Sequence, residues 1–361
     1  MTDLREEEWE QCFVEARPDP ELSRELRRAL GVAPPGLEYI ASCPWLARWT
    51  ATVNLTDRTL VHVPLDLFEM IFMAVSQDNS CRFCYGGRET LLRILGFDQE
   101  RIRRLEEVFF ASDLDDRDLR ALDFAKRVSH SNPLPTDADK QALRDVGYEE
   151  EAIRELVFVA AAVTAINRTA TFIAMPPEKV EAFAERWYIR LARPLIAARF
   201  RARRDVGVRV SLSPDEKEGP FSGIVLALDG LPVAGSLRRL IDNAWESTIL
   251  SRRTKALIFA VVARGLGCQR SEQEARRLLA DEGVSQEQSE DYLAHLGSSD
   301  LDPIENAIAP FARETIRYRT LPIQRRARAL REQLSLEEFL ETVGMVALAN
   351  LVCRLGVVID E

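Results

Sequence analysis

The residues of this chain best suited to chemistry are two cysteines in a C-x-x-C arrangement. Cys81 and Cys84 form the only such pair among the six cysteines. Residues three apart on a helix are neighbours, so the two sulfurs could meet and form a disulfide. Near a helix N-terminus, the positive end of the helix dipole would also favour the thiolate form and lower a thiol pKa. The spacing alone leaves three uses open: a redox pair, a metal site, or packing in a core.

The surrounding sequence offers few partners for a metal. A Cys/His zinc site needs a second pair of ligands at suitable spacing. The chain has only three histidines, and none lies within ten residues of the C-x-x-C: His62, His130 and His295. We therefore expect no metal at this position.

Two charged residues fall on otherwise apolar helix faces close to the pair. Glu69 lies four residues after Leu65 and three before Phe72, and Arg88 follows Cys84 by one helical turn. A charge on an inward-facing stripe is costly unless it is paired. We expect Glu69 and Arg88 to face each other or to share a polar pocket beside the cysteines. Arg88 could then stabilise the Cys84 thiolate, or the two charges could simply join two helices.

The elements that carry these residues are predicted to be helices. Apolar side chains recur at helical spacing from Cys81 to Leu95, with an N-cap expected from residues 78–80 and a helix end at Gly96. A second helix is expected from Leu65, directly after Pro64. The Ala-rich segment 151–173 is almost uncharged in its middle and predicts a buried central helix. The predicted fold class is all-α.

A constant offset in residue number relates the two halves of the chain. The offset that takes Cys81 to Cys268 also takes Gly96 to Gly283, and it relates the pairs Phe124-Ala125 and Phe311-Ala312, Leu134-Pro135 and Leu321-Pro322, and Leu143-Arg144 and Leu330-Arg331. Several matches in order at one offset indicate a tandem duplication. We predict an N-terminal extension over 1–60, a first repeat over 61–189, a connector over 190–244 and a second repeat over 245–361.

The same offset predicts that the second repeat is catalytically silent. It pairs Glu69 with Ala256, Cys84 with Ser271 and Arg88 with Ala275. Both charges and one sulfur are therefore missing together, as expected for one functional unit kept in the first repeat and lost in the second. Cys268 and Cys353 are expected to be buried thiols.

Two arginine-rich segments could bind an anion or could be solvated helix faces. One lies in the connector: Arg190, Arg193, Arg199, Arg201, Arg203, Arg204 and Arg209. The other lies within 310–326 and combines Arg313, Glu314, Arg317, Tyr318, Arg319, Gln324 and Arg325. A charge run is more commonly a solvated face than a ligand site, so the solvated interpretation is favoured for both.

The motif around the pair resembles the AhpD-like branch of the carboxymuconolactone decarboxylase family. The resemblance rests on Glu69, eleven intervening residues, the sequence Cys81-Arg82-Phe83-Cys84, three more residues and the position of Arg88. The later segment INRTATF is similar to the family's closing helix, and the second repeat resembles the unit in degenerate form. One position departs from the family pattern, because Arg88 stands where the family has a proton-relay histidine.

The resemblance implies a thiol peroxidase or a disulfide oxidoreductase. Cys84 would be the attacking thiolate, Cys81 the resolving cysteine and Glu69 the general base. The substrate would be a hydroperoxide or a disulfide, a dithiol would supply electrons, and no cofactor would be needed. The alternative is a non-catalytic helical scaffold or a redox sensor of the same fold. Family members assemble through helix faces, so we expect a homo-oligomer, a dimer or a trimer, with seams at 156–166 and 343–351.

Composition and charge exclude several other functions. The net charge of −10 is opposite to that of a general nucleic-acid binder, so we expect no nucleic-acid partner. No apolar run approaches the roughly 20 residues that span a bilayer, and the acidic start MTDLREEEWEQ lacks the features of a secretory signal. We expect a cytoplasmic protein without a membrane partner.

Overall fold

The first half of the molecule is a succession of helices. The computed structural model describes residues 4, 8–30, 36–53, 59–98, 100–102, 114–130, 133–177, 194–195, 197–198 and 211–359. The first half contains α1 (Pro20–Leu30), the short 3-10 helix η2 (Leu37–Tyr39), α2 (Pro44–Val53), α3 (Leu65–Asp78), α4 (Arg82–Leu95), α6 (Asp116–Ser129), α7 (Asp137–Asp145) and α8 (Glu150–Phe172).

The second half is helical as well. It contains η5 (Asp215–Lys217), α11 (Ser222–Leu226), α12 (Pro232–Glu246), α13 (Arg252–Leu266), α14 (Gln269–Asp281), α15 (Gln286–His295), α16 (Pro303–Glu314), α17 (Thr320–Arg331) and α18 (Leu336–Ile359). None of the described residues forms a strand. The predicted all-α class is confirmed.

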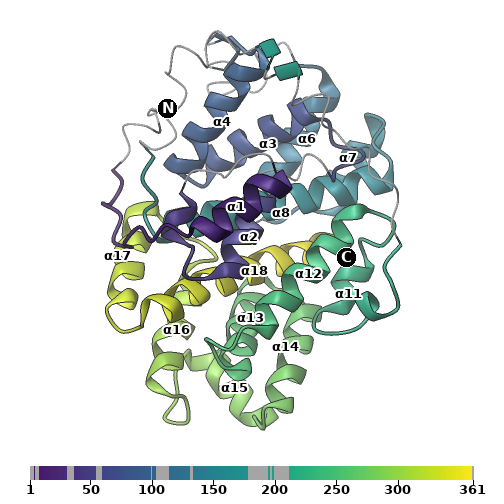
Figure 1. Cartoon of the computed structure of the whole chain (residues 1–361). Coiled ribbons are helices and arrows are strands. Elements are labelled where there is room, and N and C mark those ends of the chain that lie inside the picture. Colours follow the sequence, from purple (N-terminus) through teal and green to yellow (C-terminus); the bar gives the residue numbers. More distant parts are fainter. Residues whose placement is uncertain are drawn as a thin grey trace.

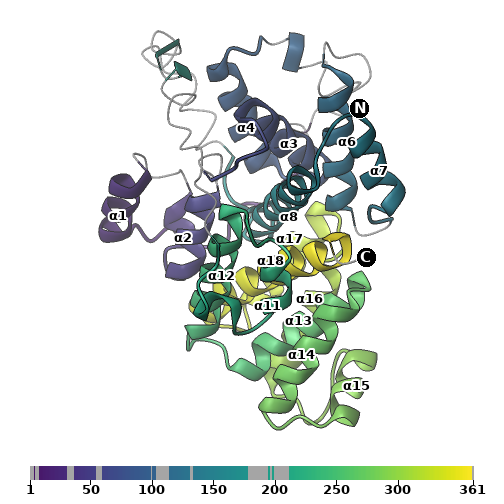
Figure 2. The same ribbon diagram turned by 90° about the vertical axis from the view of Figure 1, so that its right-hand side faces the viewer.

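Helices of the two halves follow the same order. The offset that relates Cys81 to Cys268 also takes the starts of α3, α4 and α6 to the starts of α13, α14 and α16, and the start of α18 follows that of α8 at almost the same offset. In Figure 1, α3, α4, α6 and α7 occupy the upper part of the molecule and α13–α16 the lower part. The view of Figure 2 gives the same division, with the long helices α8 and α18 between the two groups.

Matching carboxylates hold the segment that precedes α3 and the one that precedes α13. Glu155 in α8 accepts hydrogen bonds from the backbone N–H groups of Val61, His62 and Val63 at 2.6–2.8 Å. Glu341 occupies the equivalent position in α18 and accepts from the N–H of Leu250 at 3.4 Å. Each long helix therefore fixes the chain just before the helix that precedes a cysteine turn.

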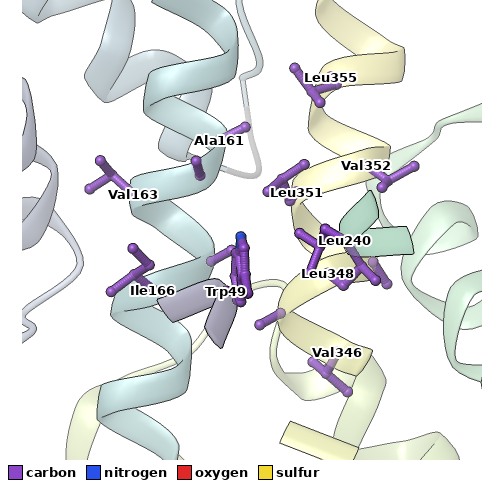
Figure 3. Close-up of a cluster of buried hydrophobic side chains, with 14 of the residues drawn as sticks. Trp49, Ala161, Val163, Ile166, Leu240, Val346, Leu348, Leu351, Val352 and Leu355 are labelled. Atoms are coloured by element: carbon purple, nitrogen blue, oxygen red, sulfur yellow. The ribbon is translucent and has the colours of Figure 1, made fainter. Parts of the chain in front are cut away.

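The contact between α8 and α18 forms the centre of the core. Figure 3 shows Ala161 on the side of α8 that faces Leu351 of α18, with Trp49 between the two helices, while Val163 and Ile166 project from the opposite side of α8. All of these side chains are buried. The stretches 156–166 and 343–351 were expected to be seams between subunits, and this expectation needs correction. They pack against each other inside one chain, because each is the apolar face that the other half needs to bury.

Each of the two long helices carries a buried arginine that reaches across this contact to the other half of the chain. Arg168 of α8 donates to the carbonyl oxygens of Thr315 and Ile316, at the end of α16. Arg354 of α18 donates to the carbonyl oxygens of Val128 and His130, at the end of α6. A cation at a helix C-terminus satisfies carbonyls that lack a partner within the helix. Each half therefore caps a helix of the other.

Part of the predicted connector, residues 190–244, is helical and packs against the rest of the fold. The second part of the predicted connector forms α11 and α12, and α12 packs against α2. Leu237, Leu240 and Ile241 of α12 are buried, so this part of the connector belongs to the core. The predicted end of the first repeat at residue 189 and the seven arginines of the connector lie outside the described residues.

Although no uninterrupted apolar run in the sequence approaches the span of a bilayer, two helices, α8 and α18, are long and apolar enough overall to cross a membrane. Both are almost entirely buried within the fold, and the core helix of a globular protein has the same length and composition. Their apolar character is therefore explained by the contact that they make with each other.

Candidate functional site

The cysteine pair begins at a tight turn between α3 and α4. Ser80 adopts a left-handed backbone conformation with φ of 49°, and the N–H of Cys81 donates to the carbonyl oxygen of Ser76 at 2.8 Å. Cys81 is itself the N-cap of α4, which begins at Arg82. The expectation that residues 78–80 supply the N-cap is therefore wrong, because the left-handed turn at Ser80 delays the helix start.

The two thiols of the pair are neighbours in a buried position. The Cys81 side chain lies beside that of Cys84, and Cys81 has no exposed surface while Cys84 retains 5%. Burial raises the pKa of Cys81 well above its usual range, and the adjacent Cys84 thiol adds to this effect. The expected lowering at a helix N-terminus is thus wrong for Cys81, because loss of solvent outweighs the helix dipole. Both cysteines are free thiols here.

Glu69 and Arg88 form the expected buried ion pair. The Nη1 atom of Arg88 donates to both carboxylate oxygens of Glu69, at 2.8 and 2.9 Å. The Arg88 guanidinium also lies over the ring of Phe72, 3.7 Å from its centroid. This contact joins α3 to α4 one turn after Cys84. Because guanidinium does not lose its proton in proteins, Arg88 cannot relay protons as a histidine does.

Two hydroxyl groups near Cys81 were not predicted as site residues. Thr171 of α8 lies beside the Cys81 thiol, and it also lies beside the hydroxyl of Tyr318. Burial raises the pKa of Tyr318 to about 12, with smaller contributions from Cys81 and Cys84. Tyr318 belongs to the turn between α16 and α17, so the second half of the chain contributes to the site of the first. Both lie in segments that the sequence analysis named, Thr171 in INRTATF and Tyr318 in the arginine-rich segment 310–326, but neither was singled out as a neighbour of the cysteines.

The helix that carries Thr171 also supports the cysteine turn through Asn167. Its side-chain amide donates to the Ser76 hydroxyl at 3.0 Å and accepts from the Asn79 amide at 3.4 Å. Asn167 belongs to the INRTATF segment that resembles the family's closing helix. Through it, α8 holds the residues immediately before Cys81.

A cavity of about 680 Å³ opens beside this turn, between the two halves of the chain. The first half contributes Asn79, Ser80 and His130, and the second contributes Arg317, Tyr318, Arg319 and Thr320. Of the segment 310–326, therefore, three of the highlighted residues line the cavity. Gln324 and Arg325 instead contact Glu10 near the N-terminus.

One wall of the cavity carries a hydrogen-bonded acid–base pair. His130 is paired with Asp78, and the Ser129 hydroxyl donates to the same carboxylate at 3.2 Å. Lys126 lies 3.7 Å from the other Asp78 oxygen. His130 is half-exposed. Among the described residues it is the only histidine that lines this cavity, and no group of three or more His, Cys, Asp or Glu side chains there could hold a metal.

Fold and site together define an all-helical protein with a buried dithiol at the first turn of a helix. No family model matches the chain, and no curated protein or solved structure matches it either. Of the four predicted site residues, Cys81 lies beside Cys84, Glu69 is bonded to Arg88, and both pairs are held by α3 and α4.

Proposed function

We propose that the chain is a thiol-dependent peroxidase or disulfide oxidoreductase that uses Cys81 and Cys84. The observation that carries the proposal is the contact between these two thiols at a helix start. Two adjacent thiols can donate two electrons and two protons and become a disulfide without a large movement of the backbone. The AhpD-like resemblance assigns the same chemistry to these positions.

The two cysteines would have different roles. Cys84 keeps some exposure and would attack the peroxide oxygen as the thiolate, forming a sulfenic acid and releasing an alcohol or water. Cys81 is fully buried with a raised pKa, which suits a resolving thiol that stays protonated until the sulfenic acid forms. Its attack releases water and closes the disulfide, which an external dithiol would reduce by exchange.

The neighbouring groups would assist this chemistry. Arg88 is one turn after Cys84 and would stabilise its thiolate, while Glu69 would act as a base through water. Arg88 itself cannot relay a proton. The arginines of the cavity beside the cysteine turn favour a substrate or a partner that carries negative charge.

A redox sensor is the second candidate. The observation that favours it is the ion pair, in which Arg88 replaces a proton-relay histidine and engages both Glu69 oxygens. In such a sensor the cysteine pair would react with one equivalent of oxidant, and the resulting disulfide would be reduced only slowly. We further propose a cytoplasmic homo-oligomer, a dimer or a trimer, which light scattering would separate from a single chain of 40.9 kDa.

Turnover distinguishes the enzyme from the sensor. Consumption of cumene hydroperoxide with dithiothreitol as donor should be catalytic for the wild-type protein and should fall strongly in Cys84→Ser. Cys43→Ser is the matched control, because Cys43 is buried but lies at the start of α2, away from the pair. A single oxidation equivalent without turnover would favour the sensor. Equal turnover in wild type and Cys84→Ser would contradict both candidates.

A further inference from the structure

The second half of the chain repeats the cysteine turn in detail. Cys268 is the N-cap of α14, with φ of −79° and ψ of 89°, and Cys81 has −87° and 88° at the start of α4. A left-handed residue precedes each cysteine, Gly267 in one turn and Ser80 in the other. The Cys268 N–H donates to the Ala263 carbonyl at 2.9 Å, as Cys81 does to Ser76. Position 268 therefore presents a thiol at a helix start in the same geometry.

A different residue supplies the second sulfur. Ser271 stands where Cys84 would be, and the Cys268 thiol donates to its hydroxyl at 3.2 Å. Cys353 of α18 lies directly beside Cys268, and both are buried. The sulfur lost from α14 is thus matched by one on the long central helix that packs against it.

Gly356 makes this approach possible. A Cβ atom at position 356 would lie 2.7 Å from the Cys268 sulfur, which is closer than a real contact allows. Gly356 is one helical turn after Cys353, so the missing side chain opens a space on α18 beside that cysteine for the Cys268 sulfur. A larger residue at position 356 would therefore clash with the Cys268 side chain and displace it.

We propose that Cys268 and Cys353 are a second redox-active dithiol that closes a reversible disulfide between α14 and α18. A hydroperoxide oxidises the Cys268 thiolate to a sulfenic acid and is itself reduced to an alcohol or water. The Cys353 thiolate then attacks that sulfur, and hydroxide leaves as water after protonation. In total the two thiols lose two electrons to the hydroperoxide. An external dithiol then reduces the disulfide by exchange and restores both thiols.

A cavity provides the route for the oxidant. About 520 Å³ in volume, it is lined by Ser271, Ile224 and Arg270 among others. Ser271 is the residue that accepts the hydrogen bond from Cys268, and Ile224 also contacts the space beside Gly356. The cavity therefore ends one side chain away from the dithiol. The second half of the chain is then not silent, in contrast to the expectation from the loss of Glu69, Cys84 and Arg88 equivalents.

The test uses a protein in which the first pair has been removed. Cys81→Ser/Cys84→Ser protein should lose two thiols per chain on treatment with hydrogen peroxide and regain them with dithiothreitol. Tryptic digestion without reductant should join peptide 265–270, which carries Cys268, to peptide 332–354, which carries Cys353. Adding Cys353→Ser should abolish both the two-thiol loss and the linked peptide.

The outcome does not depend on the function proposed for the first pair. Should the double variant fold poorly by circular dichroism, the same linked peptide is sought in the wild-type protein. Full alkylation of Cys268 and Cys353 after peroxide treatment, with no linked peptide in either protein, would overturn the second dithiol. Inactivity of Cys81 and Cys84 together with a 268–353 link would instead overturn only the proposed function.

Discussion

At the scale of single residues, the buried ion pair explains why two charges can occupy apolar helix faces. Arg88 satisfies both oxygens of Glu69 and rests on the Phe72 ring, so neither charge is left without compensation. A buried charge that loses its partner costs roughly 3–5 kcal/mol, whereas removing both charges together can be nearly neutral. The pair is therefore expected to behave as one unit under mutation.

This coupling is measurable by urea denaturation. Arg88→Met and Glu69→Gln should each lower the free energy of unfolding by about 3 kcal/mol. The double variant should lose clearly less than the sum of the two, because no unpaired charge remains. Strictly additive losses would show that the two side chains do not depend on each other.

Arg88 is also expected to control the reactivity of Cys84. Removing the guanidinium in Arg88→Met should slow the alkylation of Cys84 by iodoacetamide at neutral pH, because less thiolate is present. Arg93→Met is the matched control, since Arg93 lies on the same helix but pairs with Glu89 at its far end. Unchanged alkylation in Arg88→Met, with the native circular dichroism retained, would remove Arg88 from the site.

At the scale of elements, the long helix α8 holds the segment in front of α3. Glu155 is buried and accepts three backbone N–H groups, so truncating it leaves donors without partners. Glu155→Ala should lower the free energy of unfolding by about 3 kcal/mol, given a cost of roughly 1–3 kcal/mol per unsatisfied group. Glu150→Ala, which removes an exposed pair with Arg144, should cost less than about 1 kcal/mol. Similar losses in the two variants would refute this role.

Helix positions could be predicted from the sequence because they depend on local patterns. The apolar spacing after Pro64 and the uncharged segment 151–173 correspond to α3 and α8, and Gly96 ends α4 in a left-handed conformation. The start of α4 could not be predicted, because the left-handed turn at Ser80 is set by packing and not by its residue type.

The parts of the site that come from distant segments of the chain could not be predicted from the sequence. Glu69 and Arg88 could be paired because both lie on predicted inward faces a few turns apart. Thr171 and Tyr318 approach Cys81 only because α8 and the turn after α16 meet there in the fold. The contact of Cys268 with Cys353 likewise depends on how α14 crosses α18, which no spacing in the chain indicates.

At the scale of the whole molecule, the buried thiols make stability depend on alkaline pH. Burial raises the pKa of Cys81 and of Cys353 in the folded protein, whereas an unfolded cysteine titrates near about 8.5. Above that pH the unfolded chain releases protons that the folded chain keeps. The stabilisation that these two thiols give the folded protein is therefore complete below about pH 8.5. It is lost as the pH rises toward their pKa values in the folded state.

The sign of this effect can be checked with one substitution. In reductant, the free energy of unfolding of the wild-type protein should fall between pH 8 and pH 10 more steeply than that of Cys353→Ala. The difference between the two slopes isolates this thiol from other groups that titrate in the same range. Parallel slopes would mean that the Cys353 thiol titrates alike in the folded and unfolded chains.

Trapping of the sulfenic acid tests the assignment of Cys84 as attacking thiol most directly. Single variants Cys81→Ser and Cys84→Ser are each treated with one equivalent of hydrogen peroxide in the presence of dimedone, and the adduct is located by mass spectrometry. We predict an adduct on Cys84 in Cys81→Ser, because the resolving thiol is gone, and none on Cys81 in Cys84→Ser. An adduct on Cys81 in Cys84→Ser, or no adduct on Cys84 in Cys81→Ser, would contradict the account.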